Sequence, residues 1–490
     1  MKAIFTILLG LSFTIGSAQL ITFVRSYGGT GFDYGRDVIQ DLDTGYICTG
    51  SSTSFLPDNG EAFLMKTDSL GQFQWSFNYG AEGSEWGEGV ILTLDSMYAL
   101  GGYSNSSWGA GGFDFFLVKA GQNGAPIFQK TYGGPDWDRA FDIGQLPDSG
   151  FVLVGETYSY GAGQRDCYIV RTDKNGDTIW TKTWGGSDDD YLKAVWIDGD
   201  SIVAVGGTQS FGAGMDDGLI LKMGSDGNIG WTHITGDTLV DYFNCIEGYG
   251  SYYVIGGQTE KDYALTLQDP WYFKIENDGS IVHNNFNPTN ATAGDEECMA
   301  ITVRQLNGDI VTANLNNSFG IGNGNGDLLL GKWTSNFGYV TGSWYGHEGT
   351  DIPYGVDDTY DGGIIVIADY SEYGTGGHSF MLLKKNITWN NLQISINVVN
   401  DSITTSIPMN SKSAFDAYPT IVEEFINITG IELIESINIF NINGQLVYSD
   451  NVKSEVFGNY IFDAQQLESG LYILQVISEG QSHTKKFVKQ

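Results

Sequence analysis

Residues 130–186 read KTYGGPDWDRAFDIGQLPDSGFVLVGETYSYGAGQRDCYIVRTDKNGDTIWTKTWGG, so that the phrase TYGG returns as TWGG after about fifty residues. Between the two phrases lie four runs of strand length that are rich in β-branched and aromatic residues: AFDIGQL, FVLVGETY, DCYIVRTD and TIWTKTW. Gly, Asp and Asn separate these runs. A Gly three places after the third run predicts the positive φ of a tight hairpin. The stretch therefore predicts a unit of four antiparallel strands.

The third run of this unit has relatives along much of the chain. Each contains a basic residue, and these residues follow one another at intervals of 51 to 58 residues. Four antiparallel strands in a repeat of this length have the dimensions of a β-propeller blade, and no 3.6-residue apolar period indicates helices. Seven copies predict an all-β fold with a seven-bladed β-propeller over residues 19–389. The basic residues are Lys66, Lys119, Arg171, Lys222, Lys274, Lys332 and Lys384.

The two ends of the repeat array predict how the propeller closes. A run of fourth-strand type, ITFVRSYGG (21–29), precedes every complete repeat, and the last repeat ends soon after its third strand. We therefore expect the N-terminal strand to complete the final blade beside residues 380–384, which removes an exposed sheet edge. The run ITWNNLQISINV (387–398) is the rival candidate for that place.

The beginning of the chain and its charge predict export and exclude some partners. Residues 1–18 combine one Lys, an apolar run and small residues near the end, which predicts a secretory signal peptide. No later stretch approaches eighteen apolar residues, so no transmembrane segment is expected in the mature chain. The formal net charge of −35 argues against a nucleic-acid partner, because phosphate binding needs clustered Lys and Arg.

The repeat pattern stops near residue 390. Residues 390–414, rich in Asn, Ser and Thr, are interpreted as a linker, and residues 415–490 have short alternating strands that predict a small sandwich. In this tail, YPTIVEEFINI, INIFNINGQLVY, LESGLYILQV and KKFVKQ resemble the C-terminal sorting domain of the type IX secretion system of Bacteroidota. One departure is YPT, where the family usually has Tyr-Pro-Asn-Pro.

The resemblance implies an Ig-like sandwich at 415–490 that is recognised by the type IX secretion machinery. It also implies a protein that crosses the outer membrane and is then released or displayed on the cell surface, and whether the domain is cleaved off afterwards stays open. The repeats themselves resemble the propeller repeats of secreted bacterial proteins, a resemblance that implies no particular activity.

The sequence contains no recognisable catalytic or metal-binding motif. There is no HExxH and no GxSxG, and the five His residues are scattered over different repeats. The segment from Asp173 to Asp177 has calcium-loop spacing, but Trp184 stands at the twelfth position and the segment lies in a recurring hairpin turn. We therefore expect no metal site, no cofactor and no enzymatic activity, while affinity of the acidic chain for Ca²⁺ stays open as an alternative. The four cysteines lie in separate repeats, and we expect buried free thiols: Cys48, Cys167, Cys245 and Cys298.

One face of the propeller is expected to hold a ligand. Because strands alternate in direction, the crossover after the fourth strand and the hairpin between the second and third open on the same face. The crossovers carry Asp33, Asp138, Asp190, Asp241 and Asp351. The hairpins carry an aromatic residue before a Gly-rich turn, namely Trp108, Tyr160, Phe211, Phe319 or Tyr373. The candidate ligand-binding residues are Trp108, Tyr160, Phe211, Tyr373, Asp138 and Asp190.

A structural interpretation of the same residues stays open, in which each Asp ties a turn and each aromatic ring covers the next blade. Departures from the repeat are therefore useful as additional indications of a site. They occur at FLPDNG (55–60) in the first repeat and at TEKDYALTLQDPW (259–271) in the fifth.

Three functions are consistent with the sequence. We favour an exported, non-enzymatic propeller that binds an extracellular carbohydrate or protein, because aromatic rings stack on apolar faces and carboxylates accept hydrogen bonds. The alternative is a hydrolase or lyase that acts on extracellular polysaccharide through a pair of carboxylates. A third function is that of a structural surface-layer component. Even repeats and few His residues favour binding, since an active site needs unique residues in one place.

Overall fold

The protein is described from a computed structural model, in which the chain divides into two compact units, Met1–Thr404 and Thr405–Gln490. The described residues of the first unit are 22–29, 31–54, 60–260, 268–286, 295–305, 307–317, 326–346, 349–370, 378–386 and 400–402. Those of the second unit are 416–418, 421–422, 425–429, 436–441, 446–450, 459–465, 467, 470–478 and 481–489. The predicted signal peptide (1–18) and most of the predicted linker (390–414) lie outside them. Within the described residues, no helix is long and apolar enough to cross a membrane.

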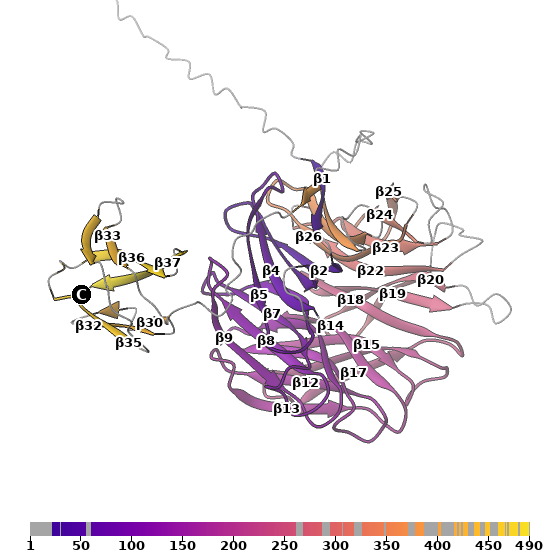
Figure 1. Cartoon of the computed structure of the whole chain (residues 1–490). Coiled ribbons are helices and arrows are strands. Elements are labelled where there is room, and N and C mark those ends of the chain that lie inside the picture. The colour runs from indigo at the N-terminus through magenta and orange to yellow at the C-terminus, as the bar shows by residue number, and fades with distance from the viewer. Residues whose placement is uncertain are drawn as a thin grey trace, which may run out of the picture. The chain divides into compact units, whose positions relative to one another are not determined.

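The first unit consists of β-sheets built from consecutive strands (Figure 1). One four-stranded antiparallel sheet contains β2 (Asp33–Gln40), β3 (Tyr46–Ser52), β4 (Glu61–Thr67) and β5 (Phe73–Tyr79). The next contains β6 (Glu85–Leu92), β7 (Tyr98–Ser104), β8 (Asp114–Ala120) and β9 (Pro126–Tyr132). It is followed by the sheet of β10 (Asp138–Gln145), β11 (Phe151–Thr157), β12 (Asp166–Thr172) and β13 (Thr178–Trp184).

Three further four-stranded sheets repeat this order. The first of them contains β14 (Asp190–Asp198), β15 (Ser201–Thr208), β16 (Asp217–Gly224) and β17 (Ile229–Thr235). The second contains β18 (Asp241–Tyr249), β19 (Tyr252–Glu260), β20 (Gln268–Glu276) and β21 (Ile281–Phe286). The third contains β22 (Glu296–Val303), β23 (Ile310–Asn316), β24 (Asp327–Trp333) and β25 (Tyr339–Tyr345). A five-stranded sheet has the order β26 (Asp351–Asp358), β27 (Ile364–Tyr370), β28 (Ser379–Lys385), β1 (Phe23–Gly28) and β29 (Asn400–Ser402).

Neighbouring sheets pack face to face through apolar side chains. The first strand of each sheet lies against the first three strands of the preceding sheet, and β2 lies against β26, β27 and β28. Between two of the sheets, for example, Val154 and Ile169 pack in one buried cluster with Ala204 and Leu221. The result is an all-β, propeller-like unit. All four cysteines are buried and free, as expected.

The strand β1 joins the two ends of the repeat array. It pairs antiparallel with β28, with Phe23 opposite Lys384 and Tyr27 opposite Phe380. The short strand β29 pairs in parallel with β1 on its other side. Residues 23–28 therefore lie beside the sheet that contains residues 380–384. The rival segment, 387–398, lies outside the described residues.

The tyrosine of the phrase TYGG connects neighbouring sheets. Tyr27, Tyr79 and Tyr132 are buried near the ends of outermost strands, and each hydroxyl donates a hydrogen bond of 2.5–2.6 Å to a glycine carbonyl of the next sheet. The glycines have φ values of 73°, 80° and 76°, so the positive φ predicted for this hairpin is confirmed. They are Gly71, Gly124 and Gly176. In TWGG, where Trp184 has no hydroxyl, the Lys182 ammonium donates to the equivalent carbonyl of Gly227.

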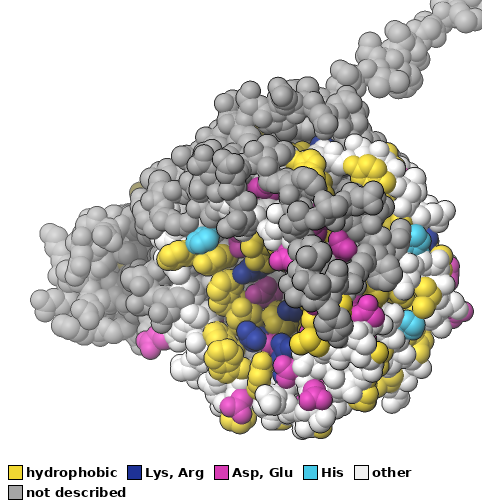
Figure 2. Space-filling view, turned by 90° about the vertical axis from the view of Figure 1, so that its right-hand side faces the viewer, with side chains coloured by type: hydrophobic (Ala, Val, Ile, Leu, Met, Phe, Trp, Pro, Cys, Tyr) yellow, Lys and Arg dark blue, Asp and Glu magenta, His cyan; other side chains and the backbone are white. Residues whose placement is uncertain are grey.

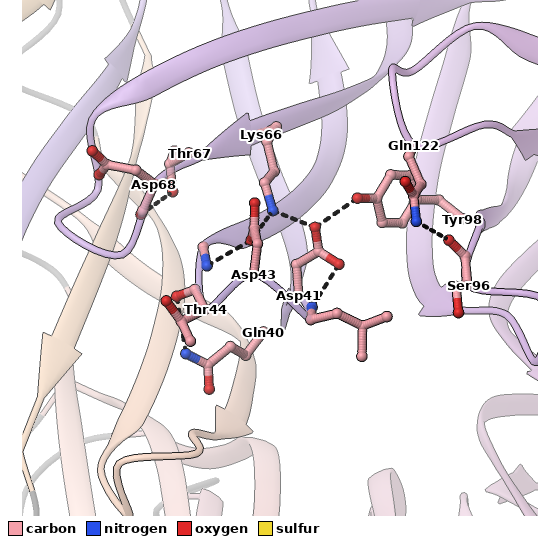
Figure 3. Close-up of polar contacts among 12 residues, drawn as sticks. Gln40, Asp41, Asp43, Thr44, Lys66, Thr67, Asp68, Ser96, Tyr98 and Gln122 are labelled. Carbon is pink, nitrogen blue, oxygen red and sulfur yellow. Dashed lines mark hydrogen bonds and ion pairs between the residues drawn. The ribbon is translucent and has the colours of Figure 1, made fainter.

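The basic residue that marks a repeat is anchored by an Asp of the hairpin between the first two strands. Lys66, 3% exposed, contacts Asp41 and Asp43 (Figure 3). Asp41 also accepts a hydrogen bond of 2.7 Å from the Tyr98 hydroxyl of the next sheet. Corresponding ion pairs are Lys119–Asp95, Arg171–Asp148, Lys222–Asp198, Lys332–Asp309 and Lys384–Asp361. Lys274 instead lies with Nζ 3.5 Å from the centroid of the Tyr252 ring.

The second unit contains two sheets in its described residues. One is antiparallel, with the order β30 (Asp416–Tyr418), β32 (Phe425–Thr429) and β35 (Asn459–Asp463). The other has the order β31 (Ile421–Val422), β37 (Gln481–Lys489), β36 (Gly470–Ser478), β33 (Ser436–Asn441) and β34 (Leu446–Asp450). Ile437, Ile439, Leu474 and Val476 of the larger sheet are buried, so alternate side chains of β33 and β36 form an apolar face.

Candidate functional site

The first strands of the seven sheets share a sequence pattern with constant and variable positions. The first position is always Asp or Glu, and the sixth is always Val or Ile, as in β2 with Asp33 and Val38. The fourth position differs in every strand. The residues at this position are Arg36, Glu88, Phe141, Lys193, Asn244, Met299 and Tyr354.

A β-bulge at the same place in every first strand explains why the fourth position differs from its neighbours. Each register with the second strand skips this residue, as between Gly35 and Asp37 in β2 or between Leu192 and Ala194 in β14. A bulged residue leaves the ladder, and its side chain is re-aimed. All seven bulged residues, which we call the bulge ring, line a cavity of about 460 Å³.

This cavity lies where the first strands meet. Its lining comes from β2, β6, β10, β14, β18, β22 and β26. Figure 2 shows a hollowed face of the protein on which Lys and Arg side chains, in dark blue, gather among hydrophobic and acidic ones. For a chain with a net charge of −35, such a gathering of cations is unusual. The bulge ring is therefore the candidate functional site.

Arg36 and its neighbours form a neutralised group on one side of the bulge ring. Its guanidinium lies 3.9 Å from the centroid of the Tyr354 ring, 3.5 Å from a carboxylate oxygen of Asp369 and 3.7 Å from one of Glu88. Burial raises the pKa of Asp369 to about 7, against the opposing effect of Arg36. Burial also raises the pKa of Glu88. The Asp369 carboxyl is thus poised to change protonation near neutral pH.

Lys193 stands apart from this group. Its Nζ lies 4.1 Å from the centroid of the Phe141 ring and 5.5 Å from that of Tyr191. The nearby cations Arg139 and Arg165 both form ion pairs with the buried carboxylate of Glu156. In the part of the chain that the structure describes, Lys193 forms no ion pair or hydrogen bond. Its burial lowers the pKa of the ammonium.

An arc of aromatic rings borders the bulge ring. Centroids of successive rings lie 5.2–6.2 Å apart along Tyr34, Trp86, Tyr103, Phe113 and Trp137, which we call the aromatic arc. Trp137 is 51% exposed at the end of the arc. Trp86 also faces the Arg36 guanidinium, 5.2 Å from its ring centroid. Aromatic faces next to charged groups suit a ligand that has both apolar and polar surfaces.

The carboxylates proposed from the sequence are buried at the crossovers. Asp138 accepts hydrogen bonds of 2.6 Å from the Gly134 amide and 2.8 Å from the Ser159 hydroxyl. Asp190 accepts equivalent bonds of 2.7 Å from Gly186 and Ser210. Each therefore ties a crossover to the adjacent hairpin. Their part in ligand binding stays a prediction.

The hairpin aromatics lie at the same face as these crossovers. Trp108, Tyr160 and Phe211 are 50%, 45% and 42% exposed. The Tyr160 hydroxyl donates a hydrogen bond of 2.9 Å to the Gly133 carbonyl of the crossover. Their binding role also stays a prediction. Tyr373, Phe319 and the central parts of the two divergent loops, 55–59 and 261–267, lie outside the described residues.

The bulge ring was not predicted from the sequence, because the predicted sites rest on loop residues and on departures from the repeat in loops. A signal was present in the strands. The buried third and sixth positions, such as Ala140 and Ile143, lie three positions apart, which is an odd interval. Strict alternation would place them on opposite faces, so their common burial indicates a bulge between them.

Three carboxylates farther along the first strands join neighbouring sheets. Asp37 accepts a hydrogen bond of 2.9 Å from the Val90 amide, and Asp142 accepts one of 2.8 Å from the Val195 amide. Asp357 accepts one of 2.9 Å from the Gln40 amide. Burial raises the pKa of Asp37 to about 6 and those of Asp142 and Asp357 to about 7. No group of three or more His, Cys, Asp or Glu residues in the described chain is arranged to hold a metal ion.

These raised pKa values predict that the protein is more stable at pH 5 than at pH 7.5. Between the usual Asp pKa of 3.8 and about 7, the folded state binds more protons than the unfolded state. The stabilisation is therefore complete below pH 3.8 and is lost as the pH rises through 6 to 7. Urea denaturation at the two pH values measures it. Asp142→Asn should reduce the difference, and equal stability at both values would contradict the prediction.

Comparison with known proteins identifies the second unit. Residues 416–490 match the family model of the secretion system C-terminal sorting domain, Por_Secre_tail. No curated protein sequence matches the chain. The match assigns the C-terminal unit to the sorting domains of the type IX secretion system, which implies export and a secreted or outer-surface location.

The chain is also similar to solved structures of low sequence identity. One is the WD40 domain of Pan2 from Neurospora crassa, with 9% identity, a TM-score of 0.46, and coverage of 72% of this chain and 90% of that chain. Another is the β-propeller domain of the Trilobed protease from Pyrococcus furiosus, with 12% identity, a TM-score of 0.43, and coverage of 75% and 99%.

Proposed function

We propose that the protein is an exported, non-enzymatic binding protein that holds an extracellular carbohydrate or protein in the bulge ring. In this proposal the first unit is a seven-bladed propeller closed by β1, and the second is an Ig-like sandwich. A signal peptide at 1–18 starts export in a Bacteroidota cell, and the type IX machinery completes it. The sorting-domain match supports this route.

The observation that carries the binding function is the contrast within the first strands. Positions that hold the sheets together repeat in chemical type, as the acidic first position does. The bulged position has seven different residue types, all of which line one cavity. Packing repeated at equivalent places favours equivalent residues, whereas a ligand without sevenfold symmetry needs different ones. The bulge ring is therefore built for a ligand rather than for the fold.

The placement of three of the five carboxyl side chains that line the cavity favours binding over hydrolysis. Asp37, Asp142 and Asp357 each accept a backbone N–H of the next sheet. A carboxylate committed to a structural hydrogen bond is poorly placed to transfer a proton to a substrate, which general acid catalysis requires. Asp369 and Glu88 lie instead with the Arg36 guanidinium.

Binding by the full-length protein to arrayed extracellular glycans and matrix proteins tests the proposal. We expect saturable binding and no turnover. Tyr354→Ala and Trp86→Ala should each weaken binding by roughly tenfold or more, since an aromatic ring contributes about 1.5–3 kcal/mol when it is buried against a ligand. Ile179→Ala, an exposed position on β13, is the control and should leave affinity unchanged.

Two results would contradict the proposal. If Tyr160→Ala or Trp108→Ala abolishes binding and the bulge-ring variants do not, the ligand lies on the hairpin aromatics instead. If the protein hydrolyses a glycan, and substitution of a single carboxylate removes that activity, the protein is an enzyme.

A further inference from the structure

The bulge ring contains a cation, Lys193, that forms no direct ion pair with a described residue. Arg36 has Glu88 and Asp369, while Arg139 and Arg165 share Glu156. Lys193 lies in the cavity wall with the faces of Phe141 and Tyr191 beside its ammonium, and the carboxyls of Glu156 and Glu88 act on it only from beyond ion-pair distance. The chain has 59 acidic residues against 24 basic ones, so a lysine without a direct carboxylate partner is unusual in it.

An unpaired, partly buried ammonium is unfavourable for folding. Its desolvation is only partly offset by the attraction of the two aromatic rings. Residues that oppose stability in this way are expected at functional sites, where a ligand supplies the missing interaction. The ligand group that fits is an anion. We propose that Lys193 binds the carboxylate of an acidic sugar residue, such as a uronic acid, in an extracellular polysaccharide. This inference rests on the binding function proposed above.

The groups around Lys193 in the cavity favour a sugar over a peptide as the ligand. Extended peptides bind proteins most readily through unpaired backbone groups at strand edges. Along the cavity, backbone amides of the first strands already donate hydrogen bonds to the carboxylates of Asp37, Asp142 and Asp357. Recognition must therefore come from side chains. The aromatic arc offers stacking faces. The Asn244 amide nitrogen already donates to Glu297 at 2.7 Å and to the Cys298 carbonyl at 3.1 Å, so this side chain offers its carbonyl oxygen as an acceptor. Rings and polar groups of this kind suit a pyranose, which has apolar faces and hydroxyl edges.

Calorimetric titration with oligogalacturonate and its methyl ester tests the inference with the full-length protein. The two probes share a backbone and differ in the carboxylate charge. We expect the acid to bind at least roughly tenfold more tightly than the ester. Lys193→Met should remove this preference by weakening the acid and leaving the ester unchanged, which forms a double-mutant cycle. Lys174→Met, an exposed lysine on the hairpin between β12 and β13, makes the same charge change as a control.

Unfolding of the Lys193→Met variant separates a ligand-binding role from a structural one. If Lys193 serves the ligand, its replacement by an apolar side chain of similar length should leave the unfolding midpoint unchanged or raise it. If Lys193 serves packing, the midpoint should fall, and the acid and the ester should lose affinity alike.

The outcomes distinguish the two proposals. Equal affinity for acid and ester would overturn the role of Lys193 while the binding function stands. Binding of an acidic peptide such as poly-glutamate, but of neither sugar, would overturn the choice of carbohydrate. If no arrayed glycan or protein binds and neither sugar does, both proposals fail.

Discussion

Deletion of residues 22–29 is expected to lower the free energy of unfolding of the first unit by at least about 5 kcal/mol, a large part of the stability of a typical domain. The strand β1 pairs with β28 over five residues, from Phe23 to Tyr27. Its Tyr27 is buried, stacks on Phe380 at 5.5 Å between ring centroids, and donates to the Gly71 carbonyl. Loss of one such buried aromatic side chain alone costs about 3–5 kcal/mol. The deletion also bares the edge of β28, which favours aggregation.

Chemical denaturation of the intact and shortened chains measures this effect. Tyr27→Phe is the matched control, since it keeps the strand and the ring but removes the hydroxyl, and it should cost only about 1 kcal/mol. A shortened chain with an unchanged midpoint would show that β1 contributes nothing to the closure of the sheet. The proposed closed propeller would then be wrong.

The second large effect is expected for Asp41→Ala, which should destabilise the protein by about 3 kcal/mol. Asp41 accepts hydrogen bonds from the buried Lys66 ammonium and from the Tyr98 hydroxyl (Figure 3). Removing it leaves Lys66 with Asp43, whose side chain is 57% exposed. Breaking a buried ion pair from one side is costly, because the remaining charge stays desolvated. The variant also separates two sheets that share this carboxylate.

Asp95→Ala provides the control in the next repeat, where Thr93 takes the place of Asp41 and Asp95 takes that of Asp43. Asp95 pairs with Lys119 at 2.6 Å, but half of its side chain is exposed, so its loss should cost about 1 kcal/mol or less. Urea denaturation of both variants compares the two costs. Equal destabilisation would mean that burial of the pair does not determine its contribution.

The strands of a repeat could be predicted closely from the sequence. TIWTKTW coincides with β13, Thr178–Trp184, and DCYIVRTD exceeds β12, Asp166–Thr172, by one residue. The hairpin glycines were also predictable, because only a few residues adopt positive φ without strain. These features depend on neighbouring residues, and their signals therefore lie in short stretches of the chain. The sorting domain was recognisable for the same reason.

The partners of conspicuous residues were not predictable in the same way. The basic residue of the third strand marks the repeat, but its partner comes from a hairpin about 25 residues earlier, as with Lys66 and Asp41. The carboxylates at Asp138 and Asp190 looked available for a ligand, yet both are buried and bonded to turn residues. Side-chain burial depends on how the sheets pack, which no local pattern records.

The repeat, the all-β class and the sorting domain could all be predicted from the amino-acid sequence. The candidate site could not, because the bulge ring takes one residue from each of seven strands that are about fifty residues apart. A bulge of one residue turns the fourth side chain of each strand into the cavity, and sheet packing then brings the seven together. Lys193 becomes unusual only there, since the absence of a direct ion pair is a property of its surroundings in space.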